Sequence, residues 1–218
     1  MKSAGNDIVA LNAIDIPRTI SPAFYSKFVT TSELQLYQYP PVDAIPFQNF
    51  IWLLWSVKES AYKYLKRAQP NLIFSPSKIT IQDIAIPTIA WEKNNDKDSF
   101  FIGDVVSGGH QLHFCSKTTT EFIASIVNDD TTFEDVFWNI KQIDQADNET
   151  QSSKVRELVL SKLATLTGYD YLCIKKNAYG CPIILQGENE LAIPVSLAHH
   201  GCFVAYSFYA PRQVIPIK

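Results

Sequence analysis

The strongest hydrophobic pattern in the chain runs from residue 47 to residue 67. This segment contains neither glycine nor proline, and its first half is almost wholly apolar. We therefore predict a long helix there whose first half is buried. Helical spacing also marks residues 21–39, before a proline-rich connection, and the apolar stretch 6–11 is typical of a strand.

Further along, alternating apolar residues favour short strands. We expect strands at 79–89, 100–106 and 110–115, with the Ser107-Gly108-Gly109 turn joining the last two as a hairpin. The segment 120–127 is apolar, but its pattern does not by itself indicate an element type.

The last third of the chain predicts one more helix followed by strands. Residues 155–166 form an amphipathic pattern that Gly168 ends. The polar stretch 144–153 before it is typical of a loop or linker. Short strands with turns at 179–180 and 187–189 are expected after it.

Length and composition exclude several classes. A chain of 218 residues is long enough for one large domain or two small lobes. The net charge of -3 argues against a nucleic-acid binder, and no stretch approaches the roughly 20 apolar residues of a membrane span. With no apolar signal core at the N-terminus, we expect a cytoplasmic protein. The four cysteines contain no C-x-x-C pair, so we expect reduced thiols.

Three short segments carry candidate chemistry, although each has an ordinary structural interpretation. Asp7 follows Gly5 at the start of the first strand, where a carboxylate is usually a turn or cap residue. Glu59 and Lys63 are four residues apart on the long helix, the spacing of a surface ion pair, but they lie next to its apolar half. His199 ends an apolar strand, where histidines are more often structural than ligands.

Taken together, these segments resemble the 4′-phosphopantetheinyl transferase superfamily. Its signatures are a G-x-D strand, a W-[ST]-x-K-E-[AS]-x-x-K helix and a strand ending in S-x-S-H. The helix signature matches at Trp55, Ser56, Lys58, Glu59, Ser60 and Lys63. Phe74-Ser75-Pro76 and the run from Arg156 to Pro182 also resemble the superfamily. The resemblance implies an α+β fold of two pseudo-symmetric lobes, each with an antiparallel sheet packed on a long helix.

The resemblance also implies an activity. A serine hydroxyl of an apo acyl or peptidyl carrier protein attacks the β-phosphorus of coenzyme A, and adenosine 3′,5′-bisphosphate leaves. Such a displacement depends on positioning and charge neutralisation, which Mg²⁺ provides. Asp7 and Glu59 match the metal carboxylates, and Glu59 is also a candidate base, directly or through water. Catalysis would depend on Glu59 and Lys63.

The expected contacts to coenzyme A come from both ends of the chain. Lys63 and His199 match phosphate-binding residues, and Ser196 and Lys58 are further candidates, although Lys58 is equally compatible with a solvated position. His200 is expected to be a neighbour without a direct role.

Three positions depart from the signatures. Val9 stands where larger, surfactin-type members have a further acidic ligand, as in the small holo-acyl-carrier-protein synthases. Cys181 replaces the lysine of Y-G-K-P, which weakens the expected 3′-phosphate site, and Ala198 replaces the serine before the histidine. The motif order is that of the small synthases, whereas the length is that of a two-lobed chain.

We therefore expect lobe one at residues 1–130, with the metal site, and lobe two at 131–218, with the histidine segment. A weak repeat supports this division, because residues 114–124 align without gaps on 195–205, with Phe122 on Phe203. The small synthases are trimers, but one chain of this length would build the cleft internally. We expect a monomer that binds neither nucleic acid nor membranes.

Two alternatives remain open from sequence. The same fold could be a non-catalytic module that binds coenzyme A or a carrier protein, which the changes at Cys181 and Ala198 would suit. An unrelated α+β interaction protein would require the helix signature to be a coincidence. The sequence does not name the carrier protein or its pathway.

Overall fold

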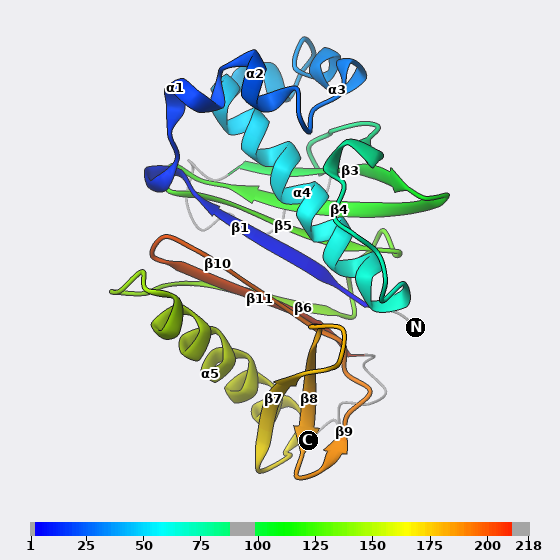
Figure 1. Cartoon of the computed structure of the whole chain (residues 1–218), viewed down its shortest axis with the longest axis vertical. Helices are drawn as coiled ribbons and strands as arrows, with labels where there is room; N and C mark the ends of the chain where they lie inside the picture. Colours follow the sequence, from blue (N-terminus) through cyan, green and yellow to red (C-terminus); the bar gives the residue numbers. More distant parts are fainter. Residues whose placement is uncertain (1–2, 88–98, 211–218) are drawn as a thin grey trace.

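The structure is a computed structural model that describes residues 3–87 and 99–210. Two antiparallel sheets meet in the middle of the molecule, and each has one long helix packed on it (Figure 1). Helix α4 (Phe47–Ala68) covers the first sheet, and helix α5 (Asn148–Thr167) covers the second. The mixed α/β architecture agrees with the α+β class expected from the sequence.

The first sheet has the strand order β1-β5-β4-β3-β2, and all its pairs are antiparallel. Its strands are β1 (Gly5–Ala10), β2 (Ile79–Ile81), β3 (Ser99–Ser107), β4 (His110–Thr118) and β5 (Phe122–Asn128). Three short helices precede α4: α1 (Ile16–Thr19), α2 (Pro22–Tyr25) and α3 (Thr31–Leu36). There are also 3-10 turns at Leu11–Ala13 and Val42–Ala44 before α4, and one at Pro76–Lys78 that leads into β2.

The second sheet has the order β10-β11-β6, and a third small sheet has the order β7-β8-β9. The strands are β6 (Val136–Gln142), β7 (Leu172–Lys176), β8 (Pro182–Gln186), β9 (Asn189–Glu190), β10 (Val195–His200) and β11 (Phe203–Tyr209). Among the described residues, no helix combines the length and hydrophobicity needed to cross a membrane.

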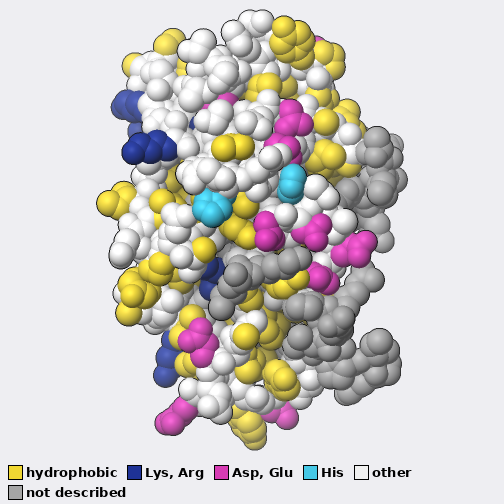
Figure 2. All heavy atoms as spheres, turned by 90° about the vertical axis from the view of Figure 1, so that its right-hand side faces the viewer, with side chains coloured by type: hydrophobic (Ala, Val, Ile, Leu, Met, Phe, Trp, Pro, Cys, Tyr) yellow, Lys and Arg dark blue, Asp and Glu magenta, His cyan; other side chains and the backbone are white. Residues whose placement is uncertain are grey.

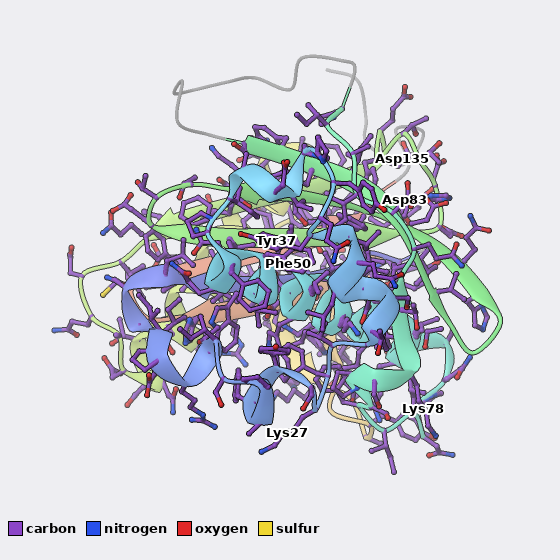
Figure 3. All side chains as sticks on the ribbon, turned by 90° about the horizontal axis from the view of Figure 1, so that it is seen from above. Lys27, Tyr37, Phe50, Lys78, Asp83 and Asp135 are labelled. Carbon is purple, nitrogen blue, oxygen red and sulfur yellow. The ribbon has the colours of Figure 1, made fainter. Side chains whose placement is uncertain are left out.

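Helix α4 is the centre of the largest core. Its apolar residues pack against the first sheet, and Phe50 is fully buried. The ring of Tyr37 lies 5.0 Å from that of Phe50, centroid to centroid, so the segment before α4 folds over its first turns (Figure 3). Lys66 and Arg67 lie in the last turn, where positive charge complements the helix dipole.

The prediction of a long helix at 47–67 and of a strand at 6–11 is confirmed. The helical pattern at 21–39 forms two short helices instead of one, because Thr30 starts a new helix through a capping box with Glu33. The prediction of a loop throughout 144–153 is wrong in its second part, because the Asp147 side chain accepts the Thr150 N–H and starts α5 at Asn148.

The strand expected at 79–89 is much shorter in the structure. Only β2 (Ile79–Ile81) forms a ladder with β3, followed by one isolated bridge between Ala85 and Ile102. Residues 88 and 89 of that prediction lie outside the described residues. The segment 120–127, whose type the sequence left open, contains most of β5.

The two long layers meet along β1. Ile8 and Ala10 pack in one buried cluster with Ala198, Phe203 and other small or apolar residues. Thus β1 contributes one face to α4 and the other to the second sheet, which places the G-x-D segment between the two halves of the molecule (Figure 1).

Candidate active site

Gly5 allows β1 to pack directly against α4. A Cβ atom at this position would lie 1.9 Å from the Ser60 carbonyl oxygen, so only glycine fits there. Side chains two residues apart on a strand share a face, and Asp7 therefore points toward the same helix. The glycine of the G-x-D segment is thus what brings the Asp7 carboxylate to α4.

Asp7, Glu59 and Lys63 meet at this contact. The Lys63 Nζ lies 3.1 Å from Asp7 Oδ1 and 3.1 Å from Glu59 Oε1. Glu59 and Lys63 are one helical turn apart and share a face of α4, whereas Asp7 comes from the facing strand. Two carboxylates distant in sequence therefore approach one ammonium group.

Burial makes this group of charges unusual. It raises the pKa of Asp7 to about 7, although the nearby Lys63 opposes that rise. Burial alone would lower the pKa of Lys63, but Asp7 and Glu59 together raise it. The Asp7 Oδ2 atom is buried and makes no hydrogen bond with the described part of the protein. A buried carboxylate oxygen without a partner favours an additional cation beside it.

These residues fit a hard divalent cation. Mg²⁺ is commonly held by one or two carboxylates and completes its shell with water and substrate phosphates. Asp7 and Glu59 supply two carboxylates, and Val9, buried on the same strand, supplies no ligand. Within residues 3–87 and 99–210, no group of three or more His, Cys, Asp or Glu side chains is placed to hold a metal by itself.

A pocket of about 300 Å³ begins at Lys63 and extends between α4 and the second half of the chain. Its described lining contains no acidic residue. Its basic side chains are Lys63, Lys66, Arg67, Arg156, Lys176 and His199. In a protein of net charge -3, this concentration of positive charge fits a ligand with several phosphates.

Arg67 connects the two sides of this pocket. Its Nη2 donates hydrogen bonds to the carbonyl oxygens of Pro182 and Val195, which belong to the second half of the chain. The guanidinium therefore fixes the end of α4 to β8 and β10 while lining the pocket.

The turn that follows β7 supplies the far wall. Lys176 stands opposite Pro182 in the β7–β8 ladder, and the Asn177 side chain accepts the Cys181 N–H. Lys176 and Cys181 both line the pocket. A basic side chain thus lies beside the position where the resemblance would place a lysine and this chain has Cys181.

Both residues expected on β10 line the same pocket. His199 does so through its side chain, and burial together with nearby Lys63 and Arg156 lowers its pKa. A phosphate would oppose that effect by favouring the charged imidazole. Ser196 also lines the pocket, although its Oγ accepts the Asn6 N–H at 3.1 Å and therefore also joins β10 to β1.

Lys58 does not reach this site. Its side chain is fully buried, and its Nζ lies 2.8 Å from Glu33 Oε2, 2.6 Å from the Phe28 carbonyl oxygen and 3.0 Å from that of Pro76. These three acceptors satisfy the ammonium. The placement does not fit the expected contact with coenzyme A, because Lys58 lies on the opposite side of α4 from Lys63.

The sequence did not single out four cations of the pocket: Lys66, Arg67, Arg156 and Lys176. None belongs to the three signature segments, and a basic residue on a helix or at the end of a strand is usually solvated. The sequence placed Arg67 at the end of the predicted helix. It could not place Arg67 in the pocket, because that depends on how the two halves of the chain pack together.

The model of the 4′-phosphopantetheinyl transferase superfamily matches residues 3–115. The chain belongs to this superfamily. The matched region contains Asp7, Glu59 and Lys63, whereas Ser196 and His199 lie beyond it. Comparison with curated proteins and with solved structures found no match. Superfamily membership implies a transferase that uses coenzyme A and a carrier protein.

Several Asp and Glu side chains gather near two histidines on one face of the molecule, which also carries some Lys and Arg side chains (Figure 2). In the first sheet, Asp104 Oδ1 lies 2.6 Å from His113 Nδ1, and Asp83 accepts the Asp104 N–H.

Proposed function

We propose that this protein transfers 4′-phosphopantetheine from coenzyme A to a serine of an apo carrier protein, with Mg²⁺ as the metal and adenosine 3′,5′-bisphosphate as the product. The observation that carries the proposal is the meeting of Asp7, Glu59 and Lys63 at one end of a pocket lined by basic residues. A phosphoryl transfer needs both features, since charge must be neutralised at the reacting phosphorus and the remaining phosphates must be held in place.

Coenzyme A would lie with its pyrophosphate near Lys63 and its 3′-phosphate near the turn after β7. Lys63 and His199 would bind the pyrophosphate end, and Arg156 and Lys176 the 3′-phosphate. Lys176 would thereby replace the basic group that Cys181 lacks.

Asp7 and Glu59 would hold Mg²⁺. The unpartnered Asp7 Oδ2 supports this assignment. The bound metal would neutralise pyrophosphate charge as the serine oxygen bonds to the β-phosphorus and the bond from that phosphorus to the bridging oxygen breaks. Glu59, less buried than Asp7, would accept the serine proton directly or through water.

The carrier protein would approach from the face formed by α1, α2 and α4. A second pocket of about 460 Å³ lies there, lined by Phe24, Trp52 and Trp55 together with Arg18 and Lys27. Lys27 projects from the outer margin (Figure 3). His200 also lines this pocket, and the Glu59 carboxylate acts on it electrostatically. Two cations beside apolar rings suit an acidic carrier whose serine must reach Glu59.

The two-lobe organisation is part of the proposal, with boundaries at 1–130 and 131–218. Each half contains a strand, then a long helix, then a hairpin whose second strand pairs with the first strand: β1, α4, β4–β5 and β6, α5, β10–β11. Thr118 pairs with Ile123, and His199 pairs with Val204. The gapless repeat alignment therefore keeps the hairpin register, which supports a pseudo-two-fold relation.

The test is transfer to an apo carrier protein, followed by mass spectrometry of the carrier with coenzyme A and Mg²⁺ present. Glu59→Gln should keep the fold, because it preserves volume, and should lower turnover by about two orders of magnitude or more by removing a metal ligand charge. Glu157→Gln is the matched control, since Glu157 is exposed on α5 and pairs there with Lys154. Transfer by Glu59→Gln at the parent rate would contradict the mechanism.

A non-catalytic module that binds coenzyme A is the second candidate, and the replacements at Cys181 and Ala198 favour it. The same assay separates the two. A protein that binds coenzyme A but leaves every tested apo carrier unmodified, with fatty-acid, polyketide and peptide carriers included, would be such a module.

A further inference from the structure

We propose that the Lys63 ammonium is an internal cation that competes with the metal for Asp7 and Glu59, and that a phosphate of the substrate releases it. The inference rests on the proposed function, because it takes these two carboxylates as the metal ligands. It adds that metal and coenzyme A bind cooperatively through one lysine side chain.

The competition follows from the geometry. Lys63 Nζ lies 3.1 Å from one oxygen of each carboxylate and thus occupies the space between them. Mg²⁺ binds oxygen at about 2.0–2.1 Å, so a metal shared by the same two oxygens would need that space. Two cations cannot share it at this separation without strong repulsion. The metal would have to displace the ammonium.

The Lys63 side chain also borders the basic pocket, where a substrate phosphate would be an alternative partner for its ammonium group. Lys63 lines the basic pocket together with His199, and its charge adds to burial in lowering the pKa of His199. An ammonium has three N–H donors, and the two carboxylates account for two of them. Its side chain is 24% exposed, and a lysine stem is flexible enough to turn toward a phosphate in the pocket.

Lys58 shows what a fixed lysine looks like on the same helix. Its side chain has no exposure, and three acceptors fill its three donors. Lys63 has neither property. The contrast distinguishes a lysine that is locked in the core from one that stands between two alternative anionic partners.

The consequence is a thermodynamic coupling. If the metal bound alone, the Lys63 ammonium would lose its carboxylate partners. If coenzyme A bound alone and attracted Lys63, the two carboxylates would be left without a cation. When both bind, each charge has a partner. Coupled sites of this kind change each other's affinity by about 5- to 150-fold, and the effect is reciprocal.

The decisive experiment measures Mn²⁺ binding to the free protein, with the signal of unbound Mn²⁺ in electron paramagnetic resonance as the readout. Lys63→Met removes the competing charge at similar length, and we expect it to bind Mn²⁺ at least about fivefold more tightly than the parent. Lys63→Arg retains a cation and should bind no more tightly than the parent. Equal or weaker Mn²⁺ binding by Lys63→Met would overturn the proposal, as would complete absence of binding by this variant.

A second measurement isolates the role of the lysine in cooperativity. Coenzyme A should strengthen Mn²⁺ binding in both proteins, because its phosphates are metal ligands, but the increase should be smaller in Lys63→Met. An equal increase in the two proteins would also overturn the inference.

Because Lys63→Met leaves two carboxylates without their cation, it is also compared by thermal unfolding with and without Mn²⁺. Mn²⁺ should raise its midpoint more than that of the parent, and an equal or smaller rise would count against the inference. The proposed function fails differently. If the parent transfers phosphopantetheine and Glu59→Gln does not, the function holds even when Lys63→Met shows no gain in Mn²⁺ affinity.

Discussion

At the scale of single residues, α4 places two lysines five positions apart in opposite surroundings. Lys63 faces β1 and the basic pocket, whereas Lys58 faces α3 and closes a buried pair with Glu33. Glu33 also accepts the Ile81 N–H, so the pair joins α3, α4 and β2. The task of Lys58 is therefore to hold the helix that carries Glu59.

The variant Lys58→Met tests that assignment. It leaves the Glu33 carboxylate buried without a cation, and losing one partner of a buried pair costs about 3–5 kcal/mol of unfolding free energy. Urea unfolding should show this loss, whereas Lys154→Met, which breaks an exposed pair with Glu157, should stay within about 0.5 kcal/mol. Unchanged stability together with weakened coenzyme A binding would contradict this assignment and indicate that Lys58 contacts the substrate.

Lys176 gives a prediction about substrate discrimination. If it contacts the 3′-phosphate, Lys176→Met should weaken coenzyme A binding roughly three- to tenfold, a modest effect because the side chain is exposed. Binding of dephospho-coenzyme A, which lacks that phosphate, should not change. Lys175→Met is the control, since consecutive side chains of a strand point to opposite faces and Lys175 therefore lies on the other face of β7 from Lys176. Calorimetry that shows equal losses for both ligands would contradict the assignment.

The sequence singled out Asp7, Glu59 and Lys63, and the structure brings these three side chains together between one strand and one helix. It did not single out Arg67 or Lys176. These two reach the pocket only because the two halves of the chain pack together, and nothing in their local sequence indicates that packing. The buried pair of Lys58 with Glu33 fits neither the expected coenzyme A contact nor a solvated position, because position along a helix does not by itself say which face is buried.

At the scale of elements, the edge of β1 is covered by side chains of β10. The Asn6 N–H donates to Ser196 Oγ, and the Ala10 N–H donates to His200 Nδ1 at 2.8 Å. Ser196 and His200 are four residues apart and so lie on one face of β10. Side-chain oxygen and nitrogen atoms thus take the place of a ladder between the two strands.

This contact predicts a dependence of stability on pH. Burial lowers the pKa of His200 from 6.5, partly opposed by Glu59, and its Nδ1 accepts the Ala10 N–H only when it is unprotonated. The unfolded chain therefore binds the proton more readily than the folded protein. The free energy of unfolding should fall as pH drops below about 6.5 and level off below the lowered pKa.

Substitutions at His200 separate its contribution from that of other groups. His200→Asn places an oxygen near the position of Nδ1, so it should keep much of the stability at pH 7 and make the fall below pH 6.5 shallower. His200→Ala leaves the Ala10 N–H unsatisfied and should cost about 1–3 kcal/mol at pH 7. Chemical unfolding across this pH range is the measurement. An unchanged pH profile in His200→Asn would exclude His200 as the titrating group.

At the scale of the whole molecule, the pocket exists only because both halves contribute to it. Helix α4 provides Lys63 and Arg67, and the second half provides Arg156, Lys176 and His199. Apolar residues of β1, β5, β10 and β11 hold the halves together. The two halves of a single chain can therefore supply both walls of the pocket.

The last prediction is a monomer that binds one coenzyme A. In the proposed two-lobe arrangement, Thr118 takes the repeat position of His199. The Thr118 side chain is buried, whereas His199 lines the pocket, so the first half would offer no equivalent imidazole. Light scattering with size-exclusion chromatography should give the mass of one chain, and calorimetry one coenzyme A per chain. A pocket that is complete within one chain predicts a coenzyme A affinity that does not change on dilution. A trimer, or an affinity that falls as the protein is diluted, would show that the site lies between chains.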